Sequence, residues 1–514
     1  MSDVNDVASS QGVFTAAFKD IGGSKKDAVD VCDVVSDAVF NHGDGFNING
    51  TNSRRVEPRN TPTVINAVFN FRNFWDGRGN NVFNGSDPFG LRNTASLIWK
   101  HENGVLRQVS VSLPSSSLAS QASGPPLSGT EMSCRGRSFV KLGQKLIDQN
   151  ILSDQSISSS DSVLGNYANG RPKYRALIAQ AFQPEYWQSP AIVRFTNAHA
   201  RQVGSMDIKD PHPFANAADV DVSQMEANFS LFFGLAVQLY ESTLVANDTP
   251  FDQYAEGKST LSPQQIDGLS IFRGKGHCIN CHGGAELTNA SFRNVIDKRL
   301  EKMVICNGST KTYDTGFYNI GVRPTTDDIG VGGTDAFGNP LSESLMVANN
   351  LTSLLGNNFD LSKYSAPGKD QVNVDGAFKA PGLRNVELTG PYFHNGGKAT
   401  LKQVVEFYNR GGDFAKENQE NLDPDIQPLH LTDVEKDNLV AFLVSLTDER
   451  VRFERSPFDH PSLCLPHGQP GDTTALTNSG NGNATDNGPL FCIKEVGASG
   501  NTTPLLPFLG KTGP

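Results

Sequence analysis

The sequence predicts a mainly α-helical protein with long loops and an irregular carboxyl-terminal tail. Several segments combine an apolar stripe of helical period with a helix-capping pattern. Asn, Gly, Ser and Pro interrupt the first two hundred residues so often that short helices between loops are expected, and strand patterns are sparse. From about residue 451 the chain is rich in Ser, Gly, Asn and Pro and has no sustained period, which is typical of an irregular tail.

The length of 514 residues suits about two to four domains, and a composition of 37% hydrophobic and 19% charged residues is that of a globular protein. Residues 226–245 form a strongly apolar helix candidate, and a polar connection follows it. We therefore expect an amino-terminal domain over residues 1–248, a second domain over 249–450 and the tail over 451–514.

Three later helices are marked by capping boxes, in which a Ser or Thr precedes a Gln or Glu by three positions. Each box is followed by an apolar segment, so each marks the first turn of a helix. The pairs are Ser262 with Gln265, Thr400 with Gln403, and Thr432 with Glu435.

The net charge of −11 and the pI near 5.4 argue against a nucleic-acid-binding surface. No uninterrupted apolar run reaches the length of about 18 residues that a membrane helix needs. The start, "MSDVNDVASSQGVF", lacks the basic and apolar regions of a signal peptide, so we expect no export signal in this chain.

Five of the seven cysteines are scattered, and they indicate no disulfide framework. Cys464 and Cys492 both lie in the tail, where one bridge between them would close a loop.

The other two cysteines belong to "GKGHCINCHGG", in which Cys278, Cys281 and His282 form C-x-x-C-H, the attachment signature of c-type haem. On one helical turn the two thiols can bond the two vinyl groups while the imidazole reaches the iron. The alternative is half of a zinc site, which needs a second Cys/His pair, and Cys306 has no such neighbour in the sequence. The sequence favours haem.

The opposite face of the iron could be open or could hold a second ligand, and this choice separates ligand chemistry from electron transfer. The sequence offers Met303, Met346, His394 and Tyr408. Each also has an ordinary structural explanation, because methionine commonly fills cores and a tyrosine on an apolar stripe commonly packs.

Four segments in order resemble the bacterial di-haem cytochrome c peroxidases and their MauG-like and rubber-oxygenase-like relatives. They are "RNTPTVINAVFNFRNFWDGR", "LASQASGPPLSGTEMSC", "CINCH" and "FKAPGLRNVELTGPYFHNGGKATLKQVVEFY", and the likeness covers roughly residues 50–450. The resemblance implies two cytochrome c-like helical domains, each holding a haem, and an enzyme that couples electron transfer to hydrogen peroxide reduction.

Catalytic positions follow from the resemblance. Trp75 of "FWDGR" matches the tryptophan that relays electrons between the haems. Gln121 and Glu131 match the pair that orients and protonates peroxide at the other haem, which is general acid–base work. Tyr408 occupies the distal-ligand position, where a tyrosine is similar to the MauG-like branch.

The resemblance also implies a calcium ion, held by the Asn60 side chain and the main-chain carbonyls of Thr389 and Pro391. It implies a small redox protein or cytochrome as electron donor, hydrogen peroxide or oxygen as oxidant, and a periplasmic or secreted location.

One departure from the family pattern is serious, because the chain has a single C-x-x-C-H where two are expected. Either the first haem segment precedes a late start, which we favour because "NDVASSQGVF" is typical of a domain interior, or that haem has been lost. The alternatives are therefore a mono-haem electron-transfer protein without catalysis, or oxidation of a protein or polymer substrate.

Overall fold

The structure is a computed structural model that describes residues 11–35, 46–195, 220–356, 359–364, 367–466, 476–485 and 490–510. The chain forms two compact units. The first comprises residues 1–58, 82–239 and 459–500, and the second comprises residues 59–81, 240–458 and 501–514. The domain boundaries near residues 248 and 450 stay predictions.

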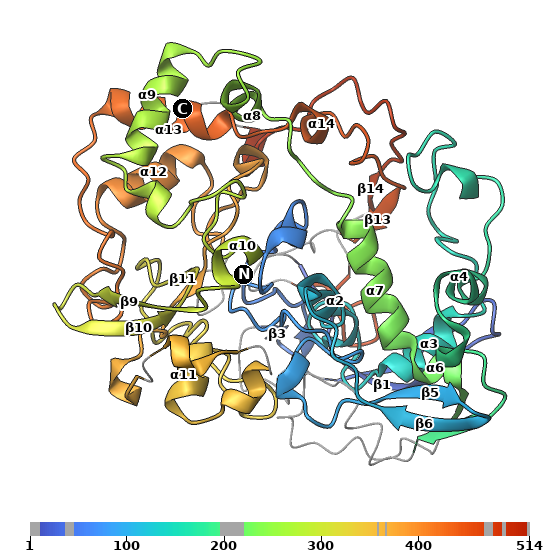
Figure 1. Cartoon of the computed structure of the whole chain (residues 1–514). Helices are drawn as coiled ribbons and strands as arrows, with labels where there is room; N and C mark the ends of the chain where they lie inside the picture. Colours follow the sequence, from blue (N-terminus) through green and yellow to red (C-terminus); the bar gives the residue numbers. More distant parts are fainter. Residues whose placement is uncertain are drawn as a thin grey trace. The chain divides into compact units, whose positions relative to one another are not determined.

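The second unit is built around helices whose first turns are capped as the sequence predicts. In α9 (Pro263–Arg273) the Ser262 hydroxyl accepts the Gln265 amide, and the Gln265 side chain accepts the Ser262 amide at 2.9 Å. The same reciprocal pair begins α12 (Leu401–Asn409) and α13 (Asp433–Val444). Figure 1 shows these three helices together, with α13 in contact with both others.

Close approach of α9 to α13 depends on Gly268. A Cβ at this position would lie 2.0 Å from the carbonyl oxygen of Asn438 and 2.8 Å from the Phe442 Cβ. Phe442 is fully buried there and meets the Phe272 ring at a centroid distance of 5.2 Å. This apolar core positions the segment that follows α9.

Shorter elements complete the second unit, and they precede, separate or follow the three main helices. They are α8 (Pro250–Ala255), α10 (Phe292–Val295), β9 (Leu300–Val304), β10 (Thr310–Asp314), β11 (Phe317–Tyr318), α11 (Glu343–Ala348), β12 (Phe378–Lys379) and α14 (Glu449–Arg452). β9 pairs with β10 and β11 with β12, both antiparallel.

The first unit contains α-helices, hairpins and most of one longer helix. Its elements are β1 (Ala16–Gly22), β2 (Val29–Val34), β3 (Asn47–Ile48), β4 (Thr51–Asn52), β5 (Ile98–Glu102), β6 (Val105–Val109), α2 (Ser117–Ala122), α3 (Phe139–Leu146), α4 (Tyr174–Ala181), β7 (Ile192–Phe195), β8 (Val220–Ser223), α6 (Gln224–Ala227), α7 (Phe229–Glu241), β13 (Leu463–Leu465) and β14 (Phe491–Ile493). The core gathers α7 residues Phe229 and Phe232 against Phe83 and Phe139.

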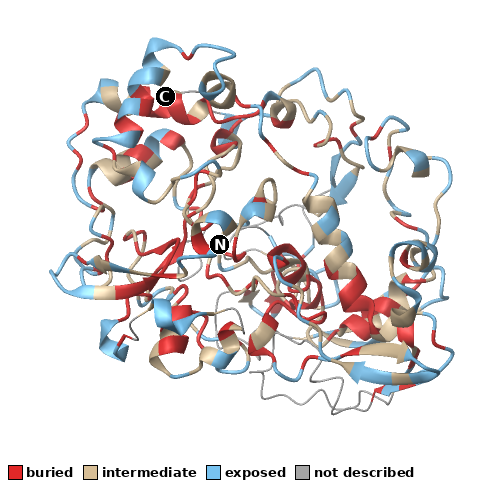
Figure 2. Ribbon diagram, viewed as in Figure 1, coloured by how far each residue is buried: buried red, intermediate tan, exposed pale blue. Residues whose placement is uncertain are grey.

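The prediction of a mainly α protein is wrong. Within the described residues, strands form seven two-stranded antiparallel sheets, and the α-helices are short. Three hairpins turn on Asn-Gly pairs, a turn signal that the helical prediction did not use: Asn49–Gly50, Asn103–Gly104 and Asn307–Gly308. Both residues of the first two pairs have positive φ, as a tight hairpin turn requires. Figure 2 shows that β6 is largely exposed, so its sequence lacks a clear apolar alternation.

Two disulfides lie within the first unit. Cys464 bonds Cys492, which is its direct partner across the β13–β14 ladder, as the tail composition allowed. Cys32 bonds Cys134 across a separation of 102 residues, so treating these two as unrelated cysteines was wrong. Among the described helices, none is both long and apolar enough to span a bilayer.

Candidate functional site

The C-x-x-C-H motif forms a tight turn directly after α9. The helix ends at Arg273, His277 adopts a left-handed conformation with φ 56°, and Cys278–Asn280 form a 3₁₀ turn. The amides of Cys281 and His282 both donate to the Cys278 carbonyl, at 3.3 and 2.9 Å. This short turn places both thiols and the imidazole on one cavity wall.

The cavity lies in the second unit, is partly open to solvent and has a volume of about 170 Å³. Its walls are mainly apolar side chains from α9, α12, α13 and the segment around β12. Such a lining suits a large flat hydrophobic group. Its apolar residues include Phe272, Leu401, Val405, Leu439 and Leu443.

His282 is prepared to act as a metal ligand. Its Nδ1 lies 3.1 Å from the Pro381 carbonyl oxygen and 3.3 Å from that of Leu287. Because carbonyl oxygens only accept, Nδ1 carries the proton and Nε2 keeps its lone pair for a metal. Burial lowers the pKa of His282 to about 4, although the two carbonyls oppose this shift, so the ring is neutral near pH 7.

The two motif cysteines are free thiols that face the cavity. Burial raises the pKa of Cys278 to about 12 and raises that of Cys281, so both are protonated near neutral pH. In the part of the chain that the structure describes, no group of three or more His, Cys, Asp or Glu residues could hold a metal ion. The two thiols, the imidazole and the apolar walls therefore fit haem c better than zinc.

Two of the four proposed distal ligands reach this cavity. Tyr408 on α12 and His394 both line it. Burial raises the pKa of Tyr408 and lowers that of His394 to about 3, and the His394 ring stacks on Phe378 with centroids 3.6 Å apart. Met303 and Met346 pack in other clusters and are absent from the lining.

Trp75 lines the same cavity. Its indole Nε1 donates to the Asn60 carbonyl oxygen at 2.7 Å, and its own carbonyl accepts the Lys379 amide at 2.8 Å. The Trp75 and His394 ring centroids are 6.5 Å apart. These bonds fix the indole at the cavity edge, and its role as an electron relay stays a prediction.

Asn60, Thr389 and Pro391 meet at a neighbouring hollow of about 100 Å³ within the second unit. The Asn60 amide Nδ2 donates to the Pro391 carbonyl at 2.5 Å. Glu286 also lines this hollow, and its buried Oε2 has no hydrogen-bond partner among the described residues. Carbonyl, amide and carboxylate oxygens form the donor set that calcium prefers, so the residues fit that ion.

Gln121 and Glu131 lie in the first unit. Gln121 is on α2, and its buried Oε1 has no hydrogen-bond partner within the described residues. Glu131 lies in the turn that follows, where its amide donates to the Ser128 hydroxyl at 3.2 Å. Neither residue lines the cavity of the C-x-x-C-H motif.

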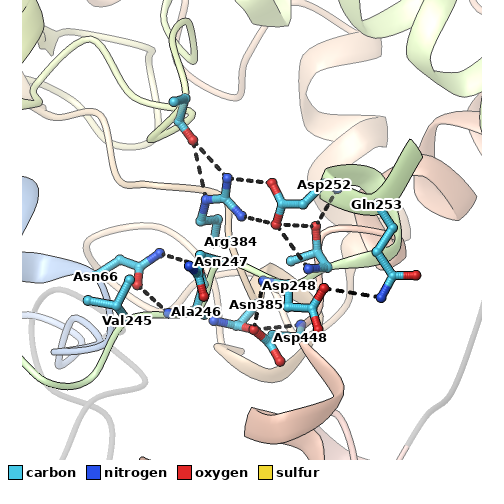
Figure 3. A network of polar contacts seen from close by, with 12 residues as sticks. Asn66, Val245, Ala246, Asn247, Asp248, Asp252, Gln253, Arg384, Asn385 and Asp448 are labelled. Carbon is cyan, nitrogen blue, oxygen red and sulfur yellow. Dashed lines mark hydrogen bonds and ion pairs between the residues drawn. The ribbon is translucent and has the colours of Figure 1, made fainter. Parts of the chain in front are cut away.

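A polar network that the sequence did not predict joins Arg384 and Asn385 to Asp252 and Asp448 (Figure 3). Arg384 donates to both carboxylate oxygens of Asp252, at 2.5 and 2.7 Å, and to the Ala285 carbonyl. Asn385 accepts the Asp448 amide at 2.9 Å. The network anchors the chain between Pro381 and Pro391, and "LRN" in the resemblance segment was its one sequence signal.

Residues 32–260 match the family model described as di-haem cytochrome c peroxidase. The chain is 33% identical over 236 residues to cytochrome-c peroxidase IdrP2 of Denitromonas iodatirespirans, covering 45% of this chain and 51% of that protein. It is 26% identical over 399 residues to cytochrome c551 peroxidase of Pseudomonas aeruginosa, covering 77% and 67%. It is 25% identical over 215 residues to methylamine utilization protein MauG of Methylorubrum extorquens, covering 42% and 43%. The chain spans about half the length of the first of these relatives.

Proposed function

We propose that this chain, whose residues 32–260 match the model of the di-haem cytochrome c peroxidase family, is a c-type haem oxidoreductase that couples electron transfer to hydrogen peroxide reduction. The cavity that brings together Cys278, Cys281 and His282 supports this proposal most strongly. We expect the electron donor to be a small redox protein or cytochrome, and the location to be periplasmic or secreted.

Haem, when bound, supplies a one-electron redox centre. Cys278 and Cys281 would hold the macrocycle through thioether bonds, and His282 would offer Nε2 while the Pro381 and Leu287 carbonyls keep its ring oriented. The apolar walls of the cavity would keep water away from the bound group. Tyr408 and His394, which also line the cavity, would be available as a second ligand.

Trp75 is proposed to carry electrons between this cavity and a peroxide-reducing centre. Its indole lines the cavity and is held by the Asn60 carbonyl. At the second centre, Glu131 would move a proton between the peroxide oxygens and Gln121 would orient the substrate. The unpaired Oε1 of Gln121 supports a role as an acceptor for such a substrate.

A calcium ion is proposed in the hollow formed by Asn60, Thr389 and Pro391, with Glu286 nearby. Binding would require the Asn60 amide to turn its oxygen toward the ion, because Nδ2 now points at the Pro391 carbonyl. The ion would stabilise the loop that also carries Pro381.

Two other functions deserve tests. A mono-haem electron-transfer protein without catalysis is consistent with the single attachment motif. Oxidation of a protein or polymer substrate is motivated by Tyr408, because a phenolate ligand disfavours reduced iron.

The test is to express the protein from its complete genomic coding sequence in a host that matures c-type cytochromes. We expect covalent haem by the pyridine haemochrome assay and oxidation of a reduced cytochrome that depends on hydrogen peroxide. A Cys278→Ala/Cys281→Ala variant is the matched control and should bind no covalent haem. Haem without peroxide turnover would leave the electron-transfer alternative, and colourless protein would refute the proposal.

A further inference from the structure

Lys379 is a buried cation beside the haem cavity. It lies on β12, only 5% of its surface is exposed, and it lines both hollows of the second unit. Its Nζ lies 6.0 Å from the centroid of the Trp75 ring, a cation–π distance. Within the described residues, no hydrogen bond or ion pair reaches its ammonium group. A buried ammonium without an anion is costly, which indicates a missing partner.

The carboxylates of the chain that line these hollows are engaged elsewhere or lie beyond ion-pair distance of the ammonium. Asp425 accepts the Asn280 amide at 2.9 Å and lies 3.6 Å from His277. Glu286 Oε1 lies 3.9 Å from Arg293 Nε, and its unpartnered Oε2 forms no ion pair with Lys379. Burial alone lowers the pKa of Lys379 to about 8, and no carboxylate offsets that shift. Among the described residues no carboxylate pairs with the ammonium group, so the site can accept an anion that is bound from outside.

We propose that Lys379 is an anion-binding residue that pairs with a carboxylate of the bound macrocycle. Haem carries two propionate groups, and these are the charges that an otherwise apolar cavity leaves unpaired. The ion pair between Lys379 and the haem carboxylate would lie next to the Trp75 indole. Lys379 would therefore orient the macrocycle relative to this side chain. The inference rests on the proposed haem occupancy and is independent of peroxide chemistry.

The experiment compares Lys379→Met and Lys379→Arg with the wild-type holoprotein. We measure the midpoint potential by spectroelectrochemistry and the propionate bending band by resonance Raman spectroscopy. Lys402→Met is the matched control, because Lys402 is exposed on α12 and pairs with Asp437 at 2.9 Å.

Loss of the cation leaves a carboxylate unneutralised near the iron, which favours the ferric state. We therefore expect Lys379→Met to lower the midpoint potential and shift the propionate band, Lys379→Arg to restore both toward wild type, and Lys402→Met to change neither. Wild-type protein in deuterium oxide should also show a shifted propionate band, which keeps the test valid if Lys379→Met does not fold.

Unchanged potential and Raman band in Lys379→Met, or a wild-type band insensitive to deuterium, would overturn the pairing. A potential that responds to added acetate while the propionate band stays constant would assign the site to a free carboxylate and would also overturn it. Failure of the proposed haem function is distinguishable, because protein without haem has no Soret band.

Discussion

Substitution of Gly268 by alanine tests whether the contact between α9 and α13 positions the haem motif. Two effects compete. Alanine in a helix interior gains about 1 kcal/mol over glycine through its higher helix propensity. The new Cβ, however, would lie 2.0 Å from the Asn438 carbonyl oxygen. Because this oxygen belongs to the backbone of α13, the clash can be relieved only if one of the two helices moves. Overpacking of this kind costs about 1–3 kcal/mol, and a backbone obstacle places it at the upper end.

We therefore expect Gly268→Ala to destabilise the protein by about 1–2 kcal/mol, the difference between these two effects. The assay is urea denaturation of the holoprotein, followed by the Soret band because the cavity adjoins α9. Asp267→Ala is the control, since Asp267 is exposed on the same helix and should change stability by less than about 0.5 kcal/mol. A Gly268→Ala protein as stable as wild type, or more stable, would refute the packing argument.

Three further predictions follow from the site. Tyr408→Phe should change the absorption spectrum of the haem if the phenol is its distal ligand, and an unchanged spectrum would contradict that ligation. In the haem-free protein, His394 has a folded pKa of about 3, below the ordinary value of about 6.5. The contribution of His394 to the free energy of unfolding is therefore fully present above about pH 6.5. It is lost as the pH falls toward about 3, because the unfolded state binds the proton at a higher pH than the folded state. In His394→Phe, the Tm from thermal unfolding should depend less on pH across this window. An equally steep fall of Tm in the variant would exclude His394 as the source. Removal of calcium with a chelator should lower Tm in wild type and have little effect on Asn60→Ala, and metal analysis that finds no calcium would reject the site.

Local chemistry made parts of this protein predictable from sequence. A capping box joins residues three positions apart, so Ser262 and Gln265 identified the start of α9 without knowledge of the fold. The same holds for Cys278, Cys281 and His282, whose spacing within one turn already predicts haem attachment. The Asn-Gly hairpins were equally local, and recognising Asn103–Gly104 would have corrected the mainly helical prediction.

Contacts between distant residues were decided only by the tertiary structure. The Pro381 carbonyl that orients His282 is 99 residues away in sequence, and Cys32 and Cys134 are 102 apart. Lys379 looks like an ordinary surface lysine in sequence, and it becomes a buried cation beside Trp75 only when β12 packs against the cavity. Burial and long-range pairing depend on the arrangement of the whole unit, because solvent exclusion is a property of packed neighbours and not of adjacent positions in the chain.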